Sequence, residues 1–196
     1  MRKTTLMAAI AIAAAGCCFS AFAQDMPDPS KTPGDVLGTV QSEEMANCIS
    51  GKTGRTVEEG NPITLQMICT PGYTQCVRKV STAIKNRVYS SYRLTGNHTG
   101  FCESPQGCEV DHLVSLELGG SNDIKNLWPE PYEGEQFNAH VKDRLENFLH
   151  AEVCAGRISL TKAQKEIATD WKGSFMRRIG QPDDEVASLQ TRTPLP

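Results

Sequence analysis

Apolar residues recur four positions apart in three stretches of the chain, and this spacing predicts three amphipathic helices. The first runs from Ser81 to Tyr92 and begins with a serine, which is a favourable cap. The second covers roughly residues 135–155. The third opens with "TKAQ", where Thr161 and Gln164 have the spacing of a capping box. The expected inward positions are Val80, Ile84, Val88 and Tyr92, then Val141, Leu145, Leu149 and Val153, then Ala163, Ile167 and Trp171.

Extended segments are predicted where polar and apolar residues alternate or where an apolar run is short. "ITLQMIC" at 63–69 alternates well enough for a strand, and "TPGY" after it is a turn sequence. "EVDHLVSLEL" at 109–118 and "IKNLWPEP" at 124–131 flank the turn "GGSND" and predict a β-hairpin. Helices around one hairpin indicate an α+β fold.

The N-terminus has the features of an export signal. Arg2 and Lys3 precede "LMAAIAIAAA", which is too short to span a bilayer, and "AFA" fits cleavage after Ala23. Lipid attachment at Cys17 is the weaker alternative, because no large aliphatic residue stands three places before it. We therefore expect a periplasmic or secreted protein that has no contact with the membrane after cleavage.

Composition along the chain suggests its organisation. Residues 1–23 are the expected signal peptide, and residues 24–60, rich in proline, glycine and polar residues, form a loosely structured arm. Residues 61–180 form the domain, and residues 181–196 a flexible tail. We expect a monomer.

Charge is distributed unevenly along the chain. Loss of Arg2 and Lys3 with the signal peptide lowers the formal charge from −3 to −5, which by itself argues against a nucleic-acid partner. Between Glu59 and Glu103, however, there is no acidic residue. The cations of this stretch are Arg78, Lys79, Lys85, Arg87 and Arg93. A local basic surface can bind a phosphate backbone, although a solvated helix face explains the charges equally well.

Six cysteines remain after signal cleavage, and an even number in an exported chain indicates disulfide bonds. They are Cys48, Cys69, Cys76, Cys102, Cys108 and Cys154. About 15 pairings are possible for six cysteines, and the spacing alone does not choose among them. A zinc site of Cys102, Cys108 and His112 is rejected, because it has no CxxC pair and needs reduced thiols outside the cytoplasm.

Four polar residues of the hairpin and the helix after it could meet in one pocket. Asp111 and His112 are adjacent on the first strand, Asn126 lies on the returning strand, and Asn138 lies in the first turn of the helix. A carboxylate and an amide oxygen can bind a divalent cation, and a neutral imidazole can take a proton from water. This chemistry fits metal-assisted hydrolysis of a phosphodiester.

The same residues lie in a longer motif. "EVDHLVSLELGGSNDIKNLWPEP" followed by "NAHVKDRLEN" resembles the HNH-type (His-Asn-His, ββα-metal) endonucleases, and it is most similar to their small exported bacterial branch. The likeness extends through "ICTPGYTQCVR" and "VCAGRISLTKAQKEIATDW", and so covers most of residues 63–171. The resemblance implies a ββα-metal core, made of a β-hairpin and a helix, with additional flanking helices and disulfides.

The resemblance also implies roles for the four residues. His112 would be the general base that activates water, and Asn126 the middle residue that braces the loop and orients the histidine. Asp111 and Asn138 would bind the metal. His140 competes for the helix position, but two residues along a helix turn the side chain by about 200°, so Asn138 is preferred.

The remaining expectations follow from the same likeness. The cofactor would be one divalent metal ion, Mg²⁺ in the first instance, with Mn²⁺, Ni²⁺ or Zn²⁺ as alternatives. The substrate would be DNA, or RNA, bound by its backbone with little sequence specificity. The candidate phosphate contacts are Arg78, Lys79, Lys85 and Lys142. The implied disulfide pairs are Cys69–Cys154, Cys102–Cys108 and Cys48–Cys76. Any inhibitor protein is unknown.

Ordinary structural roles compete with these assignments. Asn122 would be a turn former, Trp128 a core residue, Glu109 a solvated strand residue, and Glu130 part of an acidic flank to the next helix. A non-catalytic HNH-derived module that binds nucleic acid or a partner is the rival function, and a purely structural exported protein is a third.

The catalytic hypothesis makes one geometric demand. Adjacent strand residues point to opposite faces, so both members of the Asp-His pair can face one phosphate only at a strand end or a bulge. An uninterrupted ladder through both would count against the mechanism.

Overall fold

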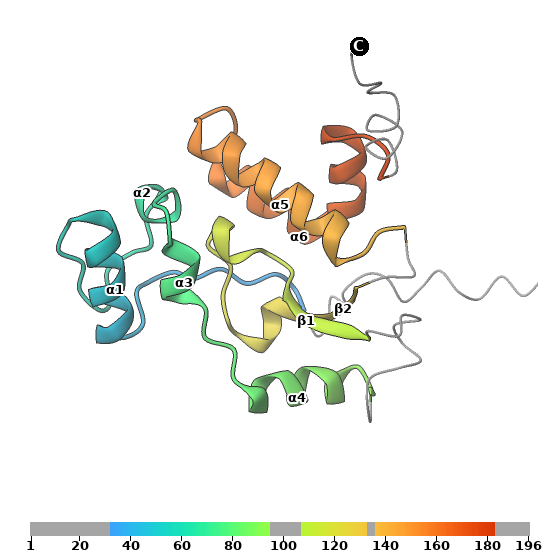
Figure 1. Cartoon of the computed structure of the whole chain (residues 1–196), viewed down its shortest axis with the longest axis horizontal. Helices are drawn as coiled ribbons and strands as arrows, with labels where there is room; N and C mark the ends of the chain where they lie inside the picture. The colour runs from blue at the N-terminus through green and yellow to red at the C-terminus, as the bar shows by residue number, and fades with distance from the viewer. Residues whose placement is uncertain (1–31, 95–106, 133–135, 183–196) are drawn as a thin grey trace, which may run out of the picture.

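A two-stranded antiparallel sheet lies between helices in the computed structural model, which describes residues 32–94, 107–132 and 136–182. Helix α4 lies on one side of the hairpin, and α5 and α6 lie on the other (Figure 1). The fold is therefore α+β, as the sequence predicts. The elements are α1 (Glu43–Thr53), α2 (Leu65–Ile68), α3 (Tyr73–Val77), α4 (Thr82–Ser91), β1 (Cys108–His112), β2 (Leu127–Pro131), α5 (Ala139–Cys154) and α6 (Leu160–Arg178), with 3₁₀ turns at Leu116–Leu118 and Ile124–Asn126.

The long helices begin at hydrogen-bonding caps. The Ser81 hydroxyl accepts the Ile84 N–H at the start of α4, which confirms the predicted cap. Helix α5 begins with Asn138 as its cap, a few residues later than the sequence suggested. Helix α6 begins with Ser159 as its cap, not with Thr161, because the Ser159 hydroxyl accepts the Lys162 N–H.

Three expectations about local structure were wrong. Residues 65–68 of the predicted strand form helix α2, capped by the Thr64 side chain. Met67 and Ile68 are consecutive and both buried, a pattern that a helical turn allows and an alternating strand does not. The arm contains helix α1 within its described part, and strand β1 ends at His112 instead of continuing to residue 118.

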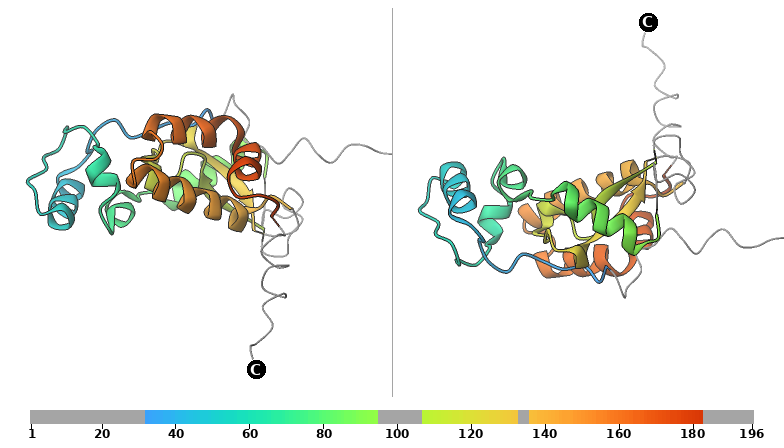
Figure 2. Two further views of the ribbon diagram at one scale, coloured as in Figure 1. Left: turned by 90° about the horizontal axis from the view of Figure 1, so that it is seen from above. Right: turned by 90° about the horizontal axis from the view of Figure 1, so that it is seen from below.

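Two apolar cores divide the molecule. One joins the hairpin residues Leu113 and Trp128 to the inner faces of α5 and α6, where Trp171 and Phe175 are fully buried. The other fills the space among α1, α2 and α3, which Figure 2 shows gathered at one end of the molecule. The predicted inward residues of α6 are confirmed, since Ala163, Ile167 and Trp171 all have 0% exposure.

Disulfides connect the short helices to each other and to α5. Cys48 of α1 bonds to Cys76 of α3, and Cys69, after α2, bonds to Cys154 at the end of α5. These are two of the pairs that the resemblance implies. Cys108 is also disulfide-bonded, but its expected partner Cys102 lies outside the described residues. Disulfides of this kind indicate an oxidising environment.

Several expectations concern parts of the chain that the structure does not describe. The signal peptide with its cleavage after Ala23, the alternative lipid site at Cys17 and the tail from residue 183 onward lie outside the described residues. Within the described ranges, every helix is too short or too polar to cross a bilayer.

Candidate active site

The hairpin places Asp111 and His112 at the end of strand β1. Asp111 pairs with Trp128 and His112 with Leu127, and the ladder is unbroken through both residues up to the last one, His112. No bulge separates them in this register. Their side chains therefore lie on opposite faces of the strand. This counts against a geometry in which both side chains face one phosphate.

His112 is held by an asparagine that the sequence suggested was a simple turn former. Its Nε2 lies 3.2 Å from Asn122 Oδ1. The orientation of the Asn122 amide is fixed, because its Nδ2 donates to the Val77 carbonyl at 2.7 Å and its Oδ1 accepts the Lys79 N–H at 3.0 Å. An oxygen facing the ring requires a proton on Nε2, which leaves Nδ1 as the basic nitrogen.

The imidazole is neutral at ordinary pH. Burial lowers the pKa of His112 below its usual range, because a buried ring is harder to charge. The Arg78 and Lys142 cations also lower this pKa, while Asp111 and the bond to Asn122 oppose them. A neutral imidazole with a free nitrogen can accept a proton from water.

A pocket of 210 Å³ opens beside His112, between α4 and the hairpin. Two of the expected phosphate contacts, Arg78 and Lys85, line it together with Glu109 and Tyr132. Lys79 lines a neighbouring cavity of 490 Å³, where Arg87 and Asn122 are also found. The basic stretch that the sequence showed thus runs past the histidine.

Asn126 braces the loop that connects the strands. Its side chain, with 0% exposure, accepts the Val114 N–H and donates to the carbonyls of Val114 and Ser121, each at 2.9 Å. Gly120 closes the same loop, where a Cβ would lie 1.7 Å from the Val114 carbonyl oxygen. The backbone carbonyl of Asn126 accepts the N–H of Leu113, the residue after His112, at 2.8 Å. Asn126 therefore positions the histidine through the backbone.

The sequence suggested that Lys142 contacts phosphate. In the structure it is instead a buried counterion with 1% exposure. Its ammonium donates to Asp111 Oδ2 at 2.6 Å, to the His112 carbonyl at 2.8 Å and to the Glu146 carboxylate. The position of this charge follows from the helix, because Lys142 lies three residues before Leu145 on the buried face of α5. A lysine therefore already neutralises the expected metal ligand Asp111.

The carboxylates of Glu109 and Glu130 lie on the same face of the hairpin as that of Asp111, which makes a cluster of three. Glu109 and Glu130 are direct cross-strand partners, and Asp111 is two residues from Glu109. One oxygen of each of the three lies within 4.8 Å of the others. Glu109 is thus not a freely solvated strand residue, and Glu130, with 1% exposure, does not flank the helix.

Burial is the main influence on the pKa values of these carboxyl groups. Burial, joined by the neighbouring Asp111 carboxylate, raises the pKa of Glu109 and raises that of Glu130 well above its usual range. Burial also raises the pKa of Glu146 to about 8. Burial opposes ionisation of Asp111 as well, but the Lys142 ammonium outweighs it and lowers the pKa of Asp111. The raised pKa values favour the protonated, neutral forms of Glu130 and Glu146, while Lys142 keeps Asp111 ionised.

The donor set fits a hard divalent cation. The three clustered side chains offer only carboxylate oxygens, and Glu130 Oε1 is buried without a hydrogen-bond partner among the described residues. A second group, Cys69, Cys154 and His150, has a suitable spacing but its two sulfurs form a disulfide and cannot bind a metal as thiolates.

The helix residues expected near the metal have other surroundings. The Asn138 side chain accepts the Val141 N–H as the cap of α5, and His140 is exposed to solvent. Asp111 and Asn138 therefore have different bonding partners, Lys142 for the first and the helix backbone for the second.

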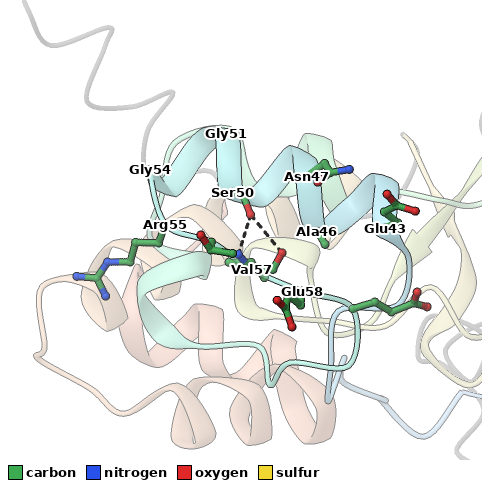
Figure 3. Close-up of a pocket in the computed structure, with 11 residues that line it drawn as sticks. Glu43, Ala46, Asn47, Ser50, Gly51, Gly54, Arg55, Val57 and Glu58 are labelled. Carbon is green, nitrogen blue, oxygen red and sulfur yellow. Dashed lines mark hydrogen bonds between the residues drawn. The ribbon is translucent and has the colours of Figure 1, made fainter.

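A larger cavity, of 800 Å³, lies far from the hairpin residues described above, between α1 and the loop that follows it (Figure 3). Glu43, Asn47, Arg55 and Glu58 are among its lining residues, and Figure 3 shows Ser50 bonded to Val57 across it. It has no histidine, cysteine or lysine in its lining, whereas the smaller pocket beside His112 is lined by a histidine and two cations.

Comparison with protein-family models, curated proteins and solved structures found no match to this chain. The HNH resemblance rests on residues of the chain itself. Sequence reasoning missed the roles of Asn122, Glu130 and Lys142. Two of them carried a signal, because Glu130 interrupts the apolar run "LWPEP" and Lys142 interrupts an apolar helix face.

Proposed function

We propose that the protein is an exported, metal-dependent HNH-type endonuclease that hydrolyses phosphodiester bonds in DNA, or RNA, with little sequence specificity. The observation that carries the proposal is the state of His112. Asn122 holds the ring through Nε2, the ring lines a pocket together with Arg78 and Lys85, and burial lowers its pKa and so favours the neutral form. A general base beside two cations is what attack of water on a phosphodiester requires.

In the proposed reaction, His112 Nδ1 takes a proton from the attacking water. Asn122 Oδ1 accepts the Nε2–H throughout and so stabilises the imidazolium that forms. Arg78 and Lys85 bind the phosphate without contacting bases, which explains the expected lack of sequence preference. When bound by the nearby carboxylates, a divalent cation supplies positive charge that stabilises the departing oxygen. Asn126 keeps the hairpin loop in place.

Plasmid digestion by the oxidised mature protein tests this proposal. We expect nicking with Mg²⁺ or Mn²⁺, loss of nicking with EDTA, and a loss of about 100-fold or more in His112→Ala, the usual contribution of a general base. His140→Ala is the matched control, because His140 is an exposed histidine on the outside of α5. Equal nicking by the wild type and His112→Ala would refute the mechanism.

One observation favours a second candidate, a nucleic-acid-binding module that does not cut. The Lys142 ammonium already lies on Asp111, as expected where an internal cation has replaced a catalytic metal. Such a module would bind DNA through Arg78 and Lys85, and its affinity would be the same with EDTA and in His112→Ala. Electrophoretic mobility shifts, measured beside the digestion assay, separate the two functions.

A further inference from the structure

We propose that Glu109, Asp111 and Glu130 together form the divalent-cation site of this protein, in place of the pair Asp111 and Asn138. The inference deepens the proposed function by naming the ligands of its metal. Its test measures metal binding directly and needs no catalytic activity.

The hairpin register brings the three carboxylates together. Glu109 and Glu130 are opposite each other across the two strands, and Asp111 follows Glu109 by two positions on the same face. One oxygen from each lies within 4.8 Å of the other two, close enough for a single ion to bridge them. Two ionised carboxylates directly opposite one another destabilise a sheet, and a cation bound between them would remove this repulsion.

The Glu130 side chain supplies an independent indication of a ligand. It has 1% exposure, and its Oε1 atom has no hydrogen-bond partner among the described residues. A buried polar atom without a partner is unfavourable, because it has lost its hydrogen bonds to water. A cation bound by Glu130 Oε1 would give this atom a partner. A buried apolar residue at position 130 would need no partner, so the presence of a carboxylate there favours a ligand.

Among the hydrogen bonds of the described residues, Lys142 reaches only one of the three clustered carboxylates, that of Asp111. Lys142 contacts Asp111 and Glu146, but it donates to neither Glu109 nor Glu130 in the bonds that the structure shows. Asp143, on the exposed side of α5, adds a further negative charge to the field at Glu109. Ligands that are all carboxylate oxygens favour Mg²⁺, Mn²⁺ or Ca²⁺ over ions that prefer nitrogen and sulfur.

The site also has access to the proposed reaction. Glu109 lines the same pocket as His112, Arg78 and Lys85. An ion held partly by Glu109 would thus lie at the edge of the pocket in which the histidine acts. Glu109, which shares a strand face with Asp111, is thus the member of the cluster that also borders the pocket of His112.

Titration of the oxidised, metal-free protein with Mn²⁺, followed by electron paramagnetic resonance, tests the site. We expect one bound Mn²⁺ in the wild type, and at least about a tenfold weaker affinity in Glu130→Gln and Glu109→Gln, equivalent to 1.4 kcal/mol. Asn138→Ser removes the amide but keeps a good helix cap, and should bind as the wild type does. Glu58→Gln, which removes an exposed carboxylate at the distant cavity, is the charge control.

Each outcome decides the proposal. Binding that persists in Glu130→Gln and falls in Asn138→Ser would overturn it, and so would a wild type that binds no Mn²⁺. If Glu130→Gln does not fold, judged by circular dichroism, unchanged binding in the more exposed Glu109→Gln would overturn it. Mn²⁺ binding without any cleavage would refute the nuclease and keep the site. Metal-dependent cleavage that is unchanged in Glu109→Gln and Glu130→Gln would refute the site and keep the nuclease.

Discussion

Replacement of Lys142 by methionine tests the electrostatics of the site most sharply. Methionine has a similar length and helix propensity, so the change removes the charge and little else. The ammonium has 1% exposure and three acceptors, Asp111, the His112 carbonyl and Glu146. Without it, the Asp111 and Glu146 side chains, with 19% and 12% exposure, have no counterion. Removing one partner of a buried ion pair typically lowers the free energy of unfolding by about 3–5 kcal/mol.

Urea unfolding at neutral pH, with and without Mn²⁺, measures this loss. Lys165→Met, on the exposed face of α6, is the matched control and should change the free energy of unfolding by less than about 0.5 kcal/mol. Because a bound cation would replace the missing ammonium, we expect Mn²⁺ to stabilise Lys142→Met more than the wild type. A variant as stable as the wild type without metal would show that Lys142 is not the counterion of this cluster.

Three further predictions concern the histidine support, one surface ion pair and one disulfide. Asn122→Ala should lower the rate of plasmid nicking by about 10–100-fold, measured at saturating metal, because the base loses the group that orients it. Arg178→Gln should lower the free energy of unfolding by about 1 kcal/mol at pH 7. The hydrogen bonds from Arg178 lower the pKa of Glu166 in the folded protein. The stabilisation by this ion pair is therefore complete above the ordinary pKa of glutamate. It should be lost as the pH falls through the lowered pKa of Glu166, which urea unfolding at several pH values would measure. Replacing Cys69 and Cys154 with serine should cost about 4.6 kcal/mol by loop entropy, since the bond closes 85 residues, and calorimetry of the oxidised variant would contradict this if stability were unchanged.

The sequence predicted the parts of the fold that depend on local signals. The Ser81 cap, the inward face of α6 and the hairpin around "GGSND" all follow from residues close together in the chain. Helix α2 was mistaken for a strand, because four residues are too few to distinguish the 3.6-residue period of a helix from the two-residue period of a strand. Its cap, Thr64, was the available signal, since its hydroxyl accepts the Met67 N–H.

The site was predictable only in part, because its charged residues pair with residues that are distant in the sequence. The motif indicated Asp111 and His112, but nothing local shows that Lys142, 31 residues from Asp111, meets it in the core. Asn122 lies in a sequence typical of turns, so nothing local distinguishes it. Its side chain is oriented toward His112 by hydrogen bonds to the backbone of residues 77 and 79, which are distant in the sequence. Glu130 was assigned to a solvated flank because carboxylates are rarely buried.

The central claim is that His112, neutral and oriented by Asn122, is the base in phosphodiester cleavage. Chemical rescue tests it directly: nicking by His112→Ala is measured with and without added imidazole, in the presence of Mg²⁺. We expect the variant to be nearly inactive alone and to gain activity as imidazole is added, while the wild type does not change. Nicking by His112→Ala at the wild-type rate, with no response to imidazole, would contradict the claim.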